Sequence, residues 1–363
     1  MADYKRPIMV MAGGTGGHVF PALAVANYLR DKGENIVWMG TKSGLESRVV
    51  PAAKFPIEWL SIEGVRGKGL LTKAIAPFKL FLACVQAIKV LNKHKPRAVL
   101  GMGGFASGPG GVMSWLLRIP LIIHEQNAVL GLTNKLLYRL ARLKYFAFPQ
   151  AASNIKGSIV VGNPVRKELL EIDPPEIRLA KHNQKNINIL VIGGSLGAKT
   201  LNDTLPSAIN NIEQSQRPNI RHQCGAGKLS SCQSLYQKFA VEADVTEFVD
   251  DMKSAYEWAD LVICRSGALT VAELSVVGIA SILVPYPYHV DDQQLFNATF
   301  LTDVNAAIVR LDKEFTAEFL ASCIVNFSQH KEQLLTMACN AREVAYTDAA
   351  SQVAEGILKE ALS

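Results

Sequence analysis

The chain has 363 residues, of which 49% are hydrophobic and 19% are charged, and its formal net charge at pH 7 is +6. This composition is typical of a globular protein of about two domains and excludes a disordered or low-complexity chain. No apolar run reaches the roughly 18 residues of a membrane-spanning helix, and no signal peptide is expected. The six cysteines contain no Cys-x-x-Cys pair, so we expect reduced thiols in a cytoplasmic protein.

The charge is unevenly distributed along the chain. Residues 1–163 hold 21 Lys and Arg against 7 Asp and Glu, a net charge of +14, whereas the remainder carries −8. No acidic residue occurs between Glu63 and Glu125, while nine Lys and Arg do. Such a one-sided field favours an anionic partner, such as a phosphate or an anionic lipid surface. Nucleic acid is the weaker interpretation, because no nucleic-acid-binding motif accompanies the charge.

Short apolar segments alternate with helical patterns in the first half of the chain. The expected elements, in chain order, are a strand at 8–11, a glycine loop at 13–17, a helix at 20–32, a strand at 35–39, a helix at 45–53, a long helix at 71–92 bent near Pro77, and strands at 98–102, 121–124 and 145–148 separated by helices. This alternation predicts βαβ units and a parallel sheet.

The same pattern restarts in the second half. The expected elements are a strand at 187–192, a glycine loop at 193–197, a helix at 201–212, strands at 220–224 and 261–264, a helix at 268–277, a strand at 281–285 and an amphipathic helix at 349–362. We therefore predict an α/β fold of two Rossmann-like, doubly wound domains, with the boundary near 163–165. Because such sheets bind ligands at the carboxyl ends of their strands, we expect a cleft there.

Three glycine-rich segments follow expected strands, at 13–17, 101–111 and 193–197. Glycines in this position let backbone N–H groups approach an anion, and the helix N-terminus adds partial positive charge. Three such segments favour a phosphate-rich ligand over ligand-free turns. The first loop lacks the final Gly of the dinucleotide fingerprint, since it reads Gly-Thr-Gly-Gly-His-Val from Gly14, and this disfavours nicotinamide chemistry.

The third loop nearly matches a P-loop, so an NTPase using residues 193–200 is the alternative function. Ala198 replaces the second Gly of that motif, and the strand at 261–264 is followed by Arg265 rather than by an Asp suited to magnesium. No Asp-x-Asp pair occurs anywhere in the chain. We expect a bound diphosphate to be neutralised by backbone amides, a helix dipole and arginine, with no obligatory metal or other cofactor.

Six motifs in order carry a resemblance to a known family. They are Gly-Gly-Thr-Gly-Gly-His at 13–18, Gly-Met-Gly-Gly-Phe-Ala-Ser-Gly-Pro at 101–109, His-Glu-Gln-Asn at 124–127, Gly-Asn-Pro-Val-Arg at 162–166, Gly-Gly-Ser-Leu-Gly-Ala at 193–198 and Cys-Arg-Ser-Gly-Ala-Leu-Thr-Val-Ala-Glu at 264–273. Together they resemble the MurG family of bacterial glycosyltransferases, over essentially the whole chain.

The resemblance implies a fold, a reaction and a location. The family has the GT-B fold, in which two Rossmann-like domains face each other across a cleft. It transfers N-acetylglucosamine from UDP-GlcNAc to lipid I (undecaprenyl-diphospho-N-acetylmuramoyl-pentapeptide), with inversion at the anomeric carbon, and so makes lipid II for peptidoglycan synthesis. The β-1,4 link forms at the C4 hydroxyl of N-acetylmuramic acid. The implied location is the cytoplasmic face of the inner membrane, as a peripheral protein.

The resemblance also implies roles for the domains. Residues 1–163 would bind the acceptor and the membrane, with 345–363 packing back onto them, and residues 164–344 would bind UDP-GlcNAc. The residues implied to contact the donor are Thr15, Gly16, Gly17, Asn127, Arg166, Ser195, Val249, Ala268, Leu269, Thr270, Val271, Ala272, Glu273 and Gln293.

Individual donor contacts follow from the same resemblance. Ser195 would contact the diphosphate, Val249 the uracil and Glu273 the ribose hydroxyls. Gln293 and Asn127 would reach the sugar hydroxyls, with Gln294 as the substitute for Gln293, because the loop before it is one residue longer than expected. The family usually has Gln where Leu196 stands, so a side-chain contact from that position is absent here.

Two residues are candidates for the catalytic base. The acceptor hydroxyl is a poor nucleophile at neutral pH, so a base near its proton accelerates attack. His18 is the first candidate, because an imidazole titrates near neutral pH. Glu125 is the second, because burial can raise the pKa of a carboxyl group. We expect the amides of Gly14, Gly103 and Gly104 to contact the acceptor diphosphate.

The segment 70–97 predicts a membrane-facing surface. Its apolar residues are Ile75, Phe78, Leu80, Phe81, Leu82, Val85 and Ile88, and its basic residues are Lys73, Lys79, Lys89, Lys93, Lys95 and Arg97. Apolar side chains at the headgroup boundary and cations on anionic lipid are typical of an interfacial helix. The alternative is an amphipathic helix packed on its own sheet, and we expect the helix to do both.

Overall fold

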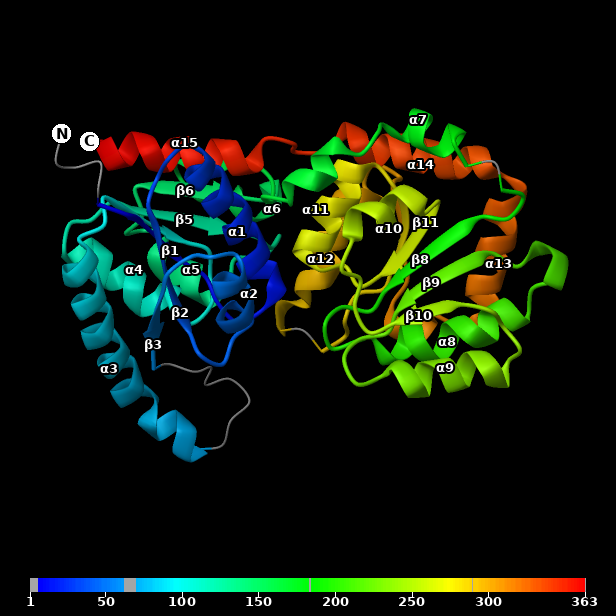
Figure 1. The fold of residues 1–363 in the computed structure, drawn as a ribbon, viewed down its shortest axis with the longest axis horizontal. Coiled ribbons are helices and arrows are strands. Elements are labelled where there is room, and N and C mark those ends of the chain that lie inside the picture. The colour runs from blue at the N-terminus through cyan, green and yellow to red at the C-terminus, as the bar shows by residue number, and fades with distance from the viewer. Residues whose placement is uncertain (1–5, 62–69, 183, 289, 363) are drawn as a thin grey trace. The chain divides into compact units, whose positions relative to one another are not determined.

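The structure, a computed structural model, describes residues 6–61, 70–182, 184–288 and 290–362. The chain divides into two compact units, which are described separately below (Figure 1). Unit 1 comprises Met1–Arg166 and Thr347–Ser363, and unit 2 comprises Lys167–Tyr346.

Within its described residues, unit 1 contains a parallel sheet of seven strands in the order β3-β2-β1-β4-β5-β6-β7. The strands are β1 (Ile8–Met11), β2 (Ile36–Thr41), β3 (Ile57–Leu60), β4 (Ala98–Gly101), β5 (Leu121–Glu125), β6 (Leu143–Phe146) and β7 (Ser158–Val160). The helices are α1 (Gly16–Asp31), α2 (Glu46–Ala52), α3 (Leu70–His94), α4 (Ser107–Leu116), α5 (Leu132–Leu137), α6 (Pro149–Ala152) and α15 (Ala349–Leu362). The strand order reverses between β1 and β4, so the loops after these two strands lie side by side.

Alternation along β1 determines which helices cover each face of this sheet. Ile8 and Val10 face a core formed with α1, α2 and α15, whereas Met9 and Met11 face a core formed with α3, α4 and α5. Successive side chains of a strand point to opposite faces, so one apolar strand supplies both cores. Figure 1 shows α15, from the C-terminal end of the chain, beside α1, which it contacts.

Unit 2 repeats this arrangement, with a parallel sheet of six strands in the order β10-β9-β8-β11-β12-β13 among the residues that the structure describes. The strands are β8 (Asn188–Ile192), β9 (Asn219–Gln223), β10 (Asp244–Thr246), β11 (Leu261–Cys264), β12 (Ala280–Leu283) and β13 (Ala307–Val309). The α-helices are α7 (Pro175–Ala180), α8 (Lys199–Asn210), α9 (Leu229–Lys238), α10 (Met252–Trp258), α11 (Ala268–Val277), α12 (Gln293–Thr302), α13 (Ala317–Gln329) and α14 (Lys331–Glu343). The 3₁₀ helices are η2 (Lys167–Glu171), η3 (Gln214–Gln216), η4 (Val290–Asp292) and η5 (Asp312–Glu314).

The strand order of unit 2 also reverses at its first strand. Ile192, the last residue of β8, pairs with Cys264, the last residue of β11. The loop 193–197 and the segment 265–267 therefore leave the sheet side by side. Helices α8 and α11 begin directly after them, so two helix N-termini point toward the same edge of the sheet.

The structure corrects the expected glycine loop at 101–111. Only residues 102–106 form a loop, because α4 begins at Ser107. Gly110 and Gly111 lie inside that helix, where added Cβ atoms would lie 2.2 Å from the Met11 sulfur and 2.8 Å from Leu137 Cδ1. Gly110 thus allows the helix to pack closely on β1, and Gly111 allows it to pack closely on α5.

Helix α15 supplies part of the core of unit 1, and this generates a stability prediction. Replacing Ile357, which is fully buried, with Ala should lower the free energy of unfolding of unit 1 by about 3 kcal/mol, because the change removes buried methylene groups and leaves a cavity. Leu362 on the same helix is 70% exposed, so Leu362→Ala is the matched control and should change stability little. Denaturant unfolding of both variants checks this, and equal losses would contradict the packing described.

Candidate active site

The loop after β1 is anchored by a buried carboxylate. Gly14 has a left-handed backbone (φ 91°), and its N–H donates a 2.8 Å hydrogen bond to Glu46 Oε2. The other oxygen of Glu46 accepts hydrogen bonds from Thr41, at 2.9 Å from the backbone N–H and 2.7 Å from the hydroxyl. Glu46 therefore fixes this loop to β2 and α2. Because the Gly14 amide is engaged in this way, it is not the free donor to an acceptor diphosphate that the sequence suggested.

The loop after β4 lies against the loop after β1. An added Cβ on Gly104 would lie 2.3 Å from the Gly13 carbonyl oxygen, and one on Gly103 would lie 2.7 Å from His18 Cδ2. Both glycines also have positive φ angles, of 89° at Gly103 and 83° at Gly104. Only glycine permits this approach. The pair therefore sets how closely the second loop approaches the His18 ring.

His18 lies in the first turn of α1, half-buried, with Nδ1 3.4 Å from the Thr15 hydroxyl. Burial lowers the pKa of His18 below its ordinary value of 6.5, although Glu125, the Gly13 backbone and Glu46 oppose the shift. Desolvation disfavours the imidazolium, and nearby carboxylates favour it. The imidazole is therefore mainly neutral at pH 7 and is able to accept a proton.

Glu125, at the end of β5, accepts four hydrogen bonds and is 2% exposed. Oε1 accepts from the backbone and side-chain amides of Asn127, at 3.0 and 3.3 Å, and Oε2 accepts from Gly131 N, at 3.0 Å, and from Asn134 Nδ2, at 2.9 Å. These donors occupy both oxygens of Glu125. Asn134 is a part of this cluster that the sequence analysis did not identify.

His124 has a separate role at the end of unit 1. Its Nε2 lies 2.9 Å from the Gly162 carbonyl oxygen and its Nδ1 lies 3.2 Å from Gln126 Nε2. Burial lowers the pKa of His124 to about 4, so the ring is neutral, donating to Gly162 and accepting from Gln126. Asn163 donates to the Gln126 carbonyl oxygen at 3.0 Å, which adds a second bond to the same segment.

Arg166 is the last residue of unit 1. Its guanidinium lies 5.5 Å from the centroid of the Phe20 ring in α1, within the range of a cation–π contact. The charge is therefore near the helix that follows the first glycine loop.

In unit 2, the exposed part of the loop after β8 consists of Gly194, Ser195 and Leu196. An added Cβ on Gly194 would meet no atom within 4 Å, so the backbone is open to a ligand there. At Gly197 a Cβ would lie 2.0 Å from the Cys224 carbonyl oxygen, which places the loop against residues 224–225. Lys199, which an NTPase would need at a phosphate, is 84% exposed in its side chain and pairs with Asp203 one turn along α8.

The N-terminus of α11 lies beside this loop. Its N-cap is Gly267, which has no side chain to cap the first turn, where residues 268–270 lie. Glu273 projects from the same helix, 4% exposed, and Tyr256 donates a 3.1 Å hydrogen bond to its Oε2. Val249 follows β10 at the same edge of the sheet and is half-buried.

Residues around β12 brace this edge. Arg265 donates to the carbonyl oxygens of Val284 and Pro285, at 3.0 and 3.2 Å, and to Asp312 Oδ1, at 2.5 Å. Asp312 also accepts a 2.6 Å hydrogen bond from Thr200. The Arg265–Asp312 pair was not among the residues singled out from the sequence, because its partners are 47 positions apart.

The two glutamines at the start of α12 differ in their contacts. Gln294 Oε1 accepts a 2.9 Å hydrogen bond from Tyr286 N, so this side chain supports the preceding loop. Gln293 is the first residue of the helix and is partly exposed. This difference favours Gln293 over Gln294 as the residue that reaches a ligand.

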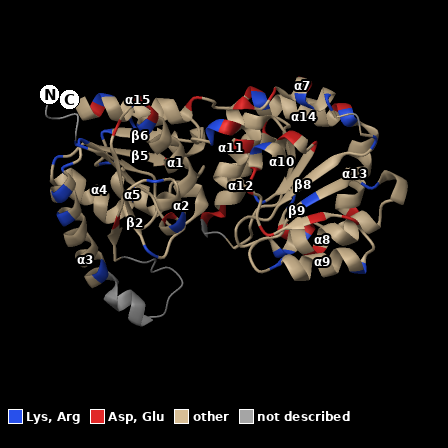
Figure 2. Ribbon diagram, viewed as in Figure 1, with Lys and Arg blue, Asp and Glu red and all other residues tan. Residues whose placement is uncertain are grey.

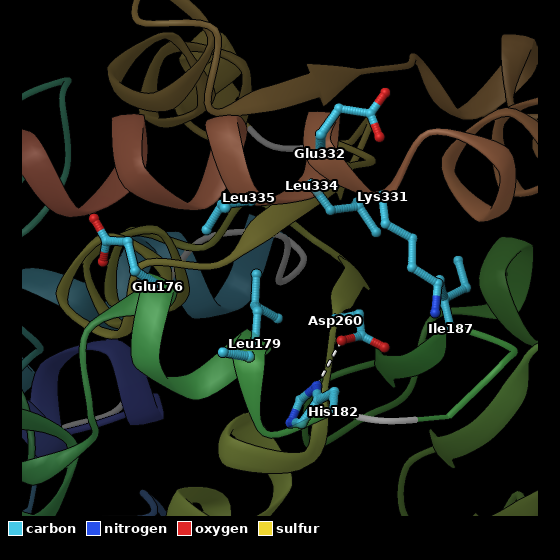
Figure 3. Close-up of a pocket in the computed structure, with 10 residues that line it drawn as sticks. Glu176, Leu179, His182, Ile187, Asp260, Lys331, Glu332, Leu334 and Leu335 are labelled. Atoms are coloured by element: carbon cyan, nitrogen blue, oxygen red, sulfur yellow. Dashed lines mark hydrogen bonds and ion pairs between the residues drawn. The ribbon is translucent and has the colours of Figure 1, made fainter.

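A cavity of about 270 Å³ in unit 2 lies at the opposite end of the strands. Its lining comes from α7, α14 and the residues that precede β8 and β11, including Leu179 and Lys331 (Figure 3). Asp260 lies in this lining, and its Oδ1 lies 2.6 Å from His182 Nδ1, at hydrogen-bond distance. The candidate residues of unit 2 lie at the carboxyl ends of the strands instead, so this cavity does not coincide with them.

In the described part of the chain, no three His, Cys, Asp or Glu side chains are grouped so that they could hold a metal ion. The groups available to a diphosphate in unit 2 are backbone N–H donors of a glycine loop and two helix N-termini. Such groups bind phosphate without a cation.

Comparisons with known proteins agree with this geometry. Residues 8–145 match the glycosyltransferase family 28 N-terminal domain, and residues 188–353 match the C-terminal domain of the same family. A relative from Alkalilimnicola ehrlichii is 49% identical over 355 residues, and one from Methylococcus capsulatus is 48% identical over 357 residues. In each alignment 98% of this chain and 99% of the relative are covered. Both relatives are named UDP-N-acetylglucosamine–N-acetylmuramyl-(pentapeptide) pyrophosphoryl-undecaprenol N-acetylglucosamine transferase.

A solved structure gives the same family, and a more distant one shares the fold. The crystal structure of Acinetobacter baumannii MurG has a TM-score of 0.81 and 39% identity, and the match covers 98% of this chain and 99% of that one. A UDP-GlcNAc 2-epimerase from Neisseria meningitidis, 12% identical with a TM-score of 0.67, shares the fold alone. The expected GT-B class of α/β fold is confirmed, and the NTPase alternative receives no support. The chain belongs to the MurG family of glycosyltransferases.

Proposed function

We propose that this chain transfers N-acetylglucosamine from UDP-GlcNAc to the C4 hydroxyl of N-acetylmuramic acid in lipid I, with inversion. The observation that carries the proposal is the near-complete alignment, at 48–49% identity, with relatives whose names describe this transfer. The geometry supports it independently, because each unit has a glycine loop and a helix N-terminus where its strand order reverses. Open α/β sheets bind ligands at that point.

The donor would bind mainly to unit 2. Ser195 and the start of α11, residues 268–272, would contact the diphosphate through backbone N–H groups and the helix dipole. Glu273 would accept hydrogen bonds from the ribose, and the Tyr256 hydroxyl, which donates to Oε2, supports this role by fixing the carboxylate. Val249 would contact the uracil and Gln293 the sugar. From unit 1, Thr15, Gly16, Gly17, Asn127 and Arg166 remain proposed donor contacts.

The acceptor would bind to unit 1, with its hydroxyl near His18. The imidazole would take the hydroxyl proton as the oxygen attacks the anomeric carbon, and UDP would leave with its charge stabilised by the loop at 193–197, Arg166 and α11. Gly103 and Gly104 remain proposed contacts for the acceptor diphosphate. Glu125 is the weaker candidate base, since both of its oxygens already accept hydrogen bonds. Its charge instead limits the fall in the pKa of His18.

We further propose that one face of unit 1 binds an anionic membrane surface. Phe78 and Phe81 of α3 are each 67% exposed. The neighbouring helices α4 and α5 add exposed side chains that the sequence analysis missed, namely Trp115, Leu116, Leu132 and Leu136. Lys79, Lys89 and Lys93 accompany them without acidic residues along the described part of α3 (Figure 2). Apolar side chains flanked by cations are suited to an anionic bilayer surface.

Parts of the expected membrane segment need correction. Arg97 is not a surface cation, because its side chain is 3% exposed and pairs with Glu34. Lys93 is exposed but pairs with Glu58 at 2.6 Å. The side chains of residues 70–76, which include Lys73 and Ile75, lie outside the described residues. No helix in the described parts of the chain is long and apolar enough to span a bilayer. The proposed location is peripheral, on the cytoplasmic face of the inner membrane.

Ligand binding separates the proposed function from the NTPase alternative. Isothermal calorimetry should show binding of UDP and UDP-GlcNAc and no binding of ATP. Lys199→Ala should leave UDP affinity within about twofold, because that side chain is exposed and pairs with Asp203 rather than facing the loop. ATP binding that is lost in Lys199→Ala would instead establish the alternative.

The pH dependence of turnover tests His18 as the base. His18→Ala should lower kcat by about 10²- to 10⁴-fold, whereas His330→Ala, an exposed histidine of unit 2, should not change it. Since the neutral imidazole is the active form, the acidic limb of kcat/KM should lie below pH 6.5. Glu125→Gln removes a charge that raises the pKa of His18, so this limb should move to still lower pH. A limb that disappears in Glu125→Gln would assign the base to Glu125.

Vesicle flotation tests the membrane surface. The wild-type protein should bind vesicles containing phosphatidylglycerol at low salt and bind phosphatidylcholine vesicles much less. Phe78→Ser with Phe81→Ser should weaken binding roughly tenfold or more, because two exposed aromatic rings no longer enter the headgroup region. Ile177→Ser, at a 51% exposed position of unit 2, is the matched control. Binding that ignores lipid charge and salt would contradict the proposal.

A further inference from the structure

Gln223 is a buried side chain at the end of β9 that the reaction scheme above does not use. It is 5% exposed, and its amide makes three hydrogen bonds. Oε1 accepts from Gly194 N at 3.0 Å, and Nε2 donates to the Gly194 carbonyl oxygen at 3.0 Å and to the Glu247 carbonyl oxygen at 2.6 Å. One side chain thus binds both backbone groups of Gly194 and a second segment of the chain.

The residue held in this way is the one that gives the loop its shape. Gly194 has a left-handed backbone (φ 78°), and the exposed residues Ser195 and Leu196 follow it. A glycine is free to adopt many conformations. The two hydrogen bonds between Gln223 and Gly194, together with a 2.9 Å bond from Gly197 N to the Gly194 carbonyl oxygen, restrict it to one. The direction of the next N–H groups, which would face the diphosphate, therefore depends on the Gln223 amide.

The third hydrogen bond, from Gln223 Nε2 to the Glu247 carbonyl oxygen, links the loop to the segment proposed to contact the uracil. Glu247 lies two residues before Val249, the proposed uracil contact. The Glu247 carboxylate also accepts a 2.8 Å hydrogen bond from Gly227 N, and Ala226 N donates to the Ser195 carbonyl oxygen at 3.2 Å. The diphosphate loop, the segment 225–227 and the segment before Val249 are thus linked through this cluster.

We propose that Gln223 is a positioning residue for the donor, which sets the distance between the diphosphate loop and the uracil-binding segment. The inference rests on the proposed function, since it requires the nucleotide to lie in unit 2. Gln223 acts through Gly194 and Glu247 and does not itself contact the substrate. A nucleoside diphosphate would contact both segments. A change in their spacing should therefore affect the affinity for the nucleotide more than it affects the stability of unit 2.

Backbone hydrogen bonds hold β9 in place without the Gln223 side chain. The side chain can therefore position the loop without being needed for the fold of unit 2. Backbone hydrogen bonds join Gly193 N to the Gln223 carbonyl oxygen at 3.0 Å and Cys224 N to the Thr246 carbonyl oxygen at 2.8 Å. β8 and β9 also pair along five residues, from Asn188 to Ile192. None of these bonds uses the side-chain amide.

The test compares Gln223→Met, which keeps the side-chain length, with Asn188→Leu. Asn188 is a fully buried amide at the opposite end of the same sheet, where Nδ2 donates to the Trp258 carbonyl oxygen at 2.9 Å. Gln223→Met, which removes all three hydrogen bonds of the amide, should raise the Kd for UDP by about tenfold to a hundredfold. It should raise KM for UDP-GlcNAc while leaving KM for a lipid I analogue unchanged.

Asn188→Leu should lower the melting temperature of unit 2 at least as much as Gln223→Met does, yet leave UDP affinity within about twofold of wild type. If Gln223→Met does not fold, Gln223→Asn, whose shorter amide cannot reach all three partners, replaces it. Two results would overturn the inference while leaving the proposed function intact. One is wild-type UDP affinity in the Gln223 variants, and the other is a loss of UDP affinity in Asn188→Leu as large as in those variants. A wild-type protein that binds UDP but does not transfer the sugar would instead overturn the proposed function.

Discussion

In each unit, a buried side chain holds the N–H of the left-handed glycine that follows the first strand. Glu46 holds Gly14 in unit 1, and Gln223 holds Gly194 in unit 2. Both anchors come from the neighbouring β-α segment of the sheet, β2–α2 or β9. A glycine loop without such an anchor would sample many conformations. With the anchor in place, α1 and α8 begin at fixed positions. The loop after β4 then packs closely on the loop after β1, and the loop after β9 packs closely on the loop after β8.

The two anchors differ in charge, and this difference acts on His18 in unit 1 and on the proposed diphosphate loop in unit 2. The carboxylate of Glu46 adds negative charge beneath the loop that carries His18, where it favours the imidazolium form and opposes the effect of burial. The amide of Gln223 is neutral, so it adds no repulsion beneath the loop proposed to bind the UDP diphosphate. Glu125 accepts four hydrogen bonds, and its charge raises the pKa of His18 against the effect of burial.

The central strands and several helices could be predicted because they are apolar and continuous. The bounds of β1, β11, α11 and α15 agree with the expected ones. The strands β3, β7, β10 and β13 were missed because they are short, with several partly exposed residues, and carry a weak alternation. In the site, motifs identified the loops, but the anchors Glu46 and Gln223 lie 32 and 29 positions from the glycines they bind, a relation that local periodicity does not reveal.

The measurement that tests the account most directly is the transfer itself. The purified chain would be incubated with UDP-GlcNAc labelled in the sugar and with a soluble-tail lipid I analogue, and the products would be separated and sequenced by mass spectrometry and NMR. We expect the labelled N-acetylglucosamine to be joined to the C4 oxygen of N-acetylmuramic acid through a β linkage, with one UDP released for each sugar transferred. Release of UDP without a labelled disaccharide, or an α linkage in the product, would contradict it.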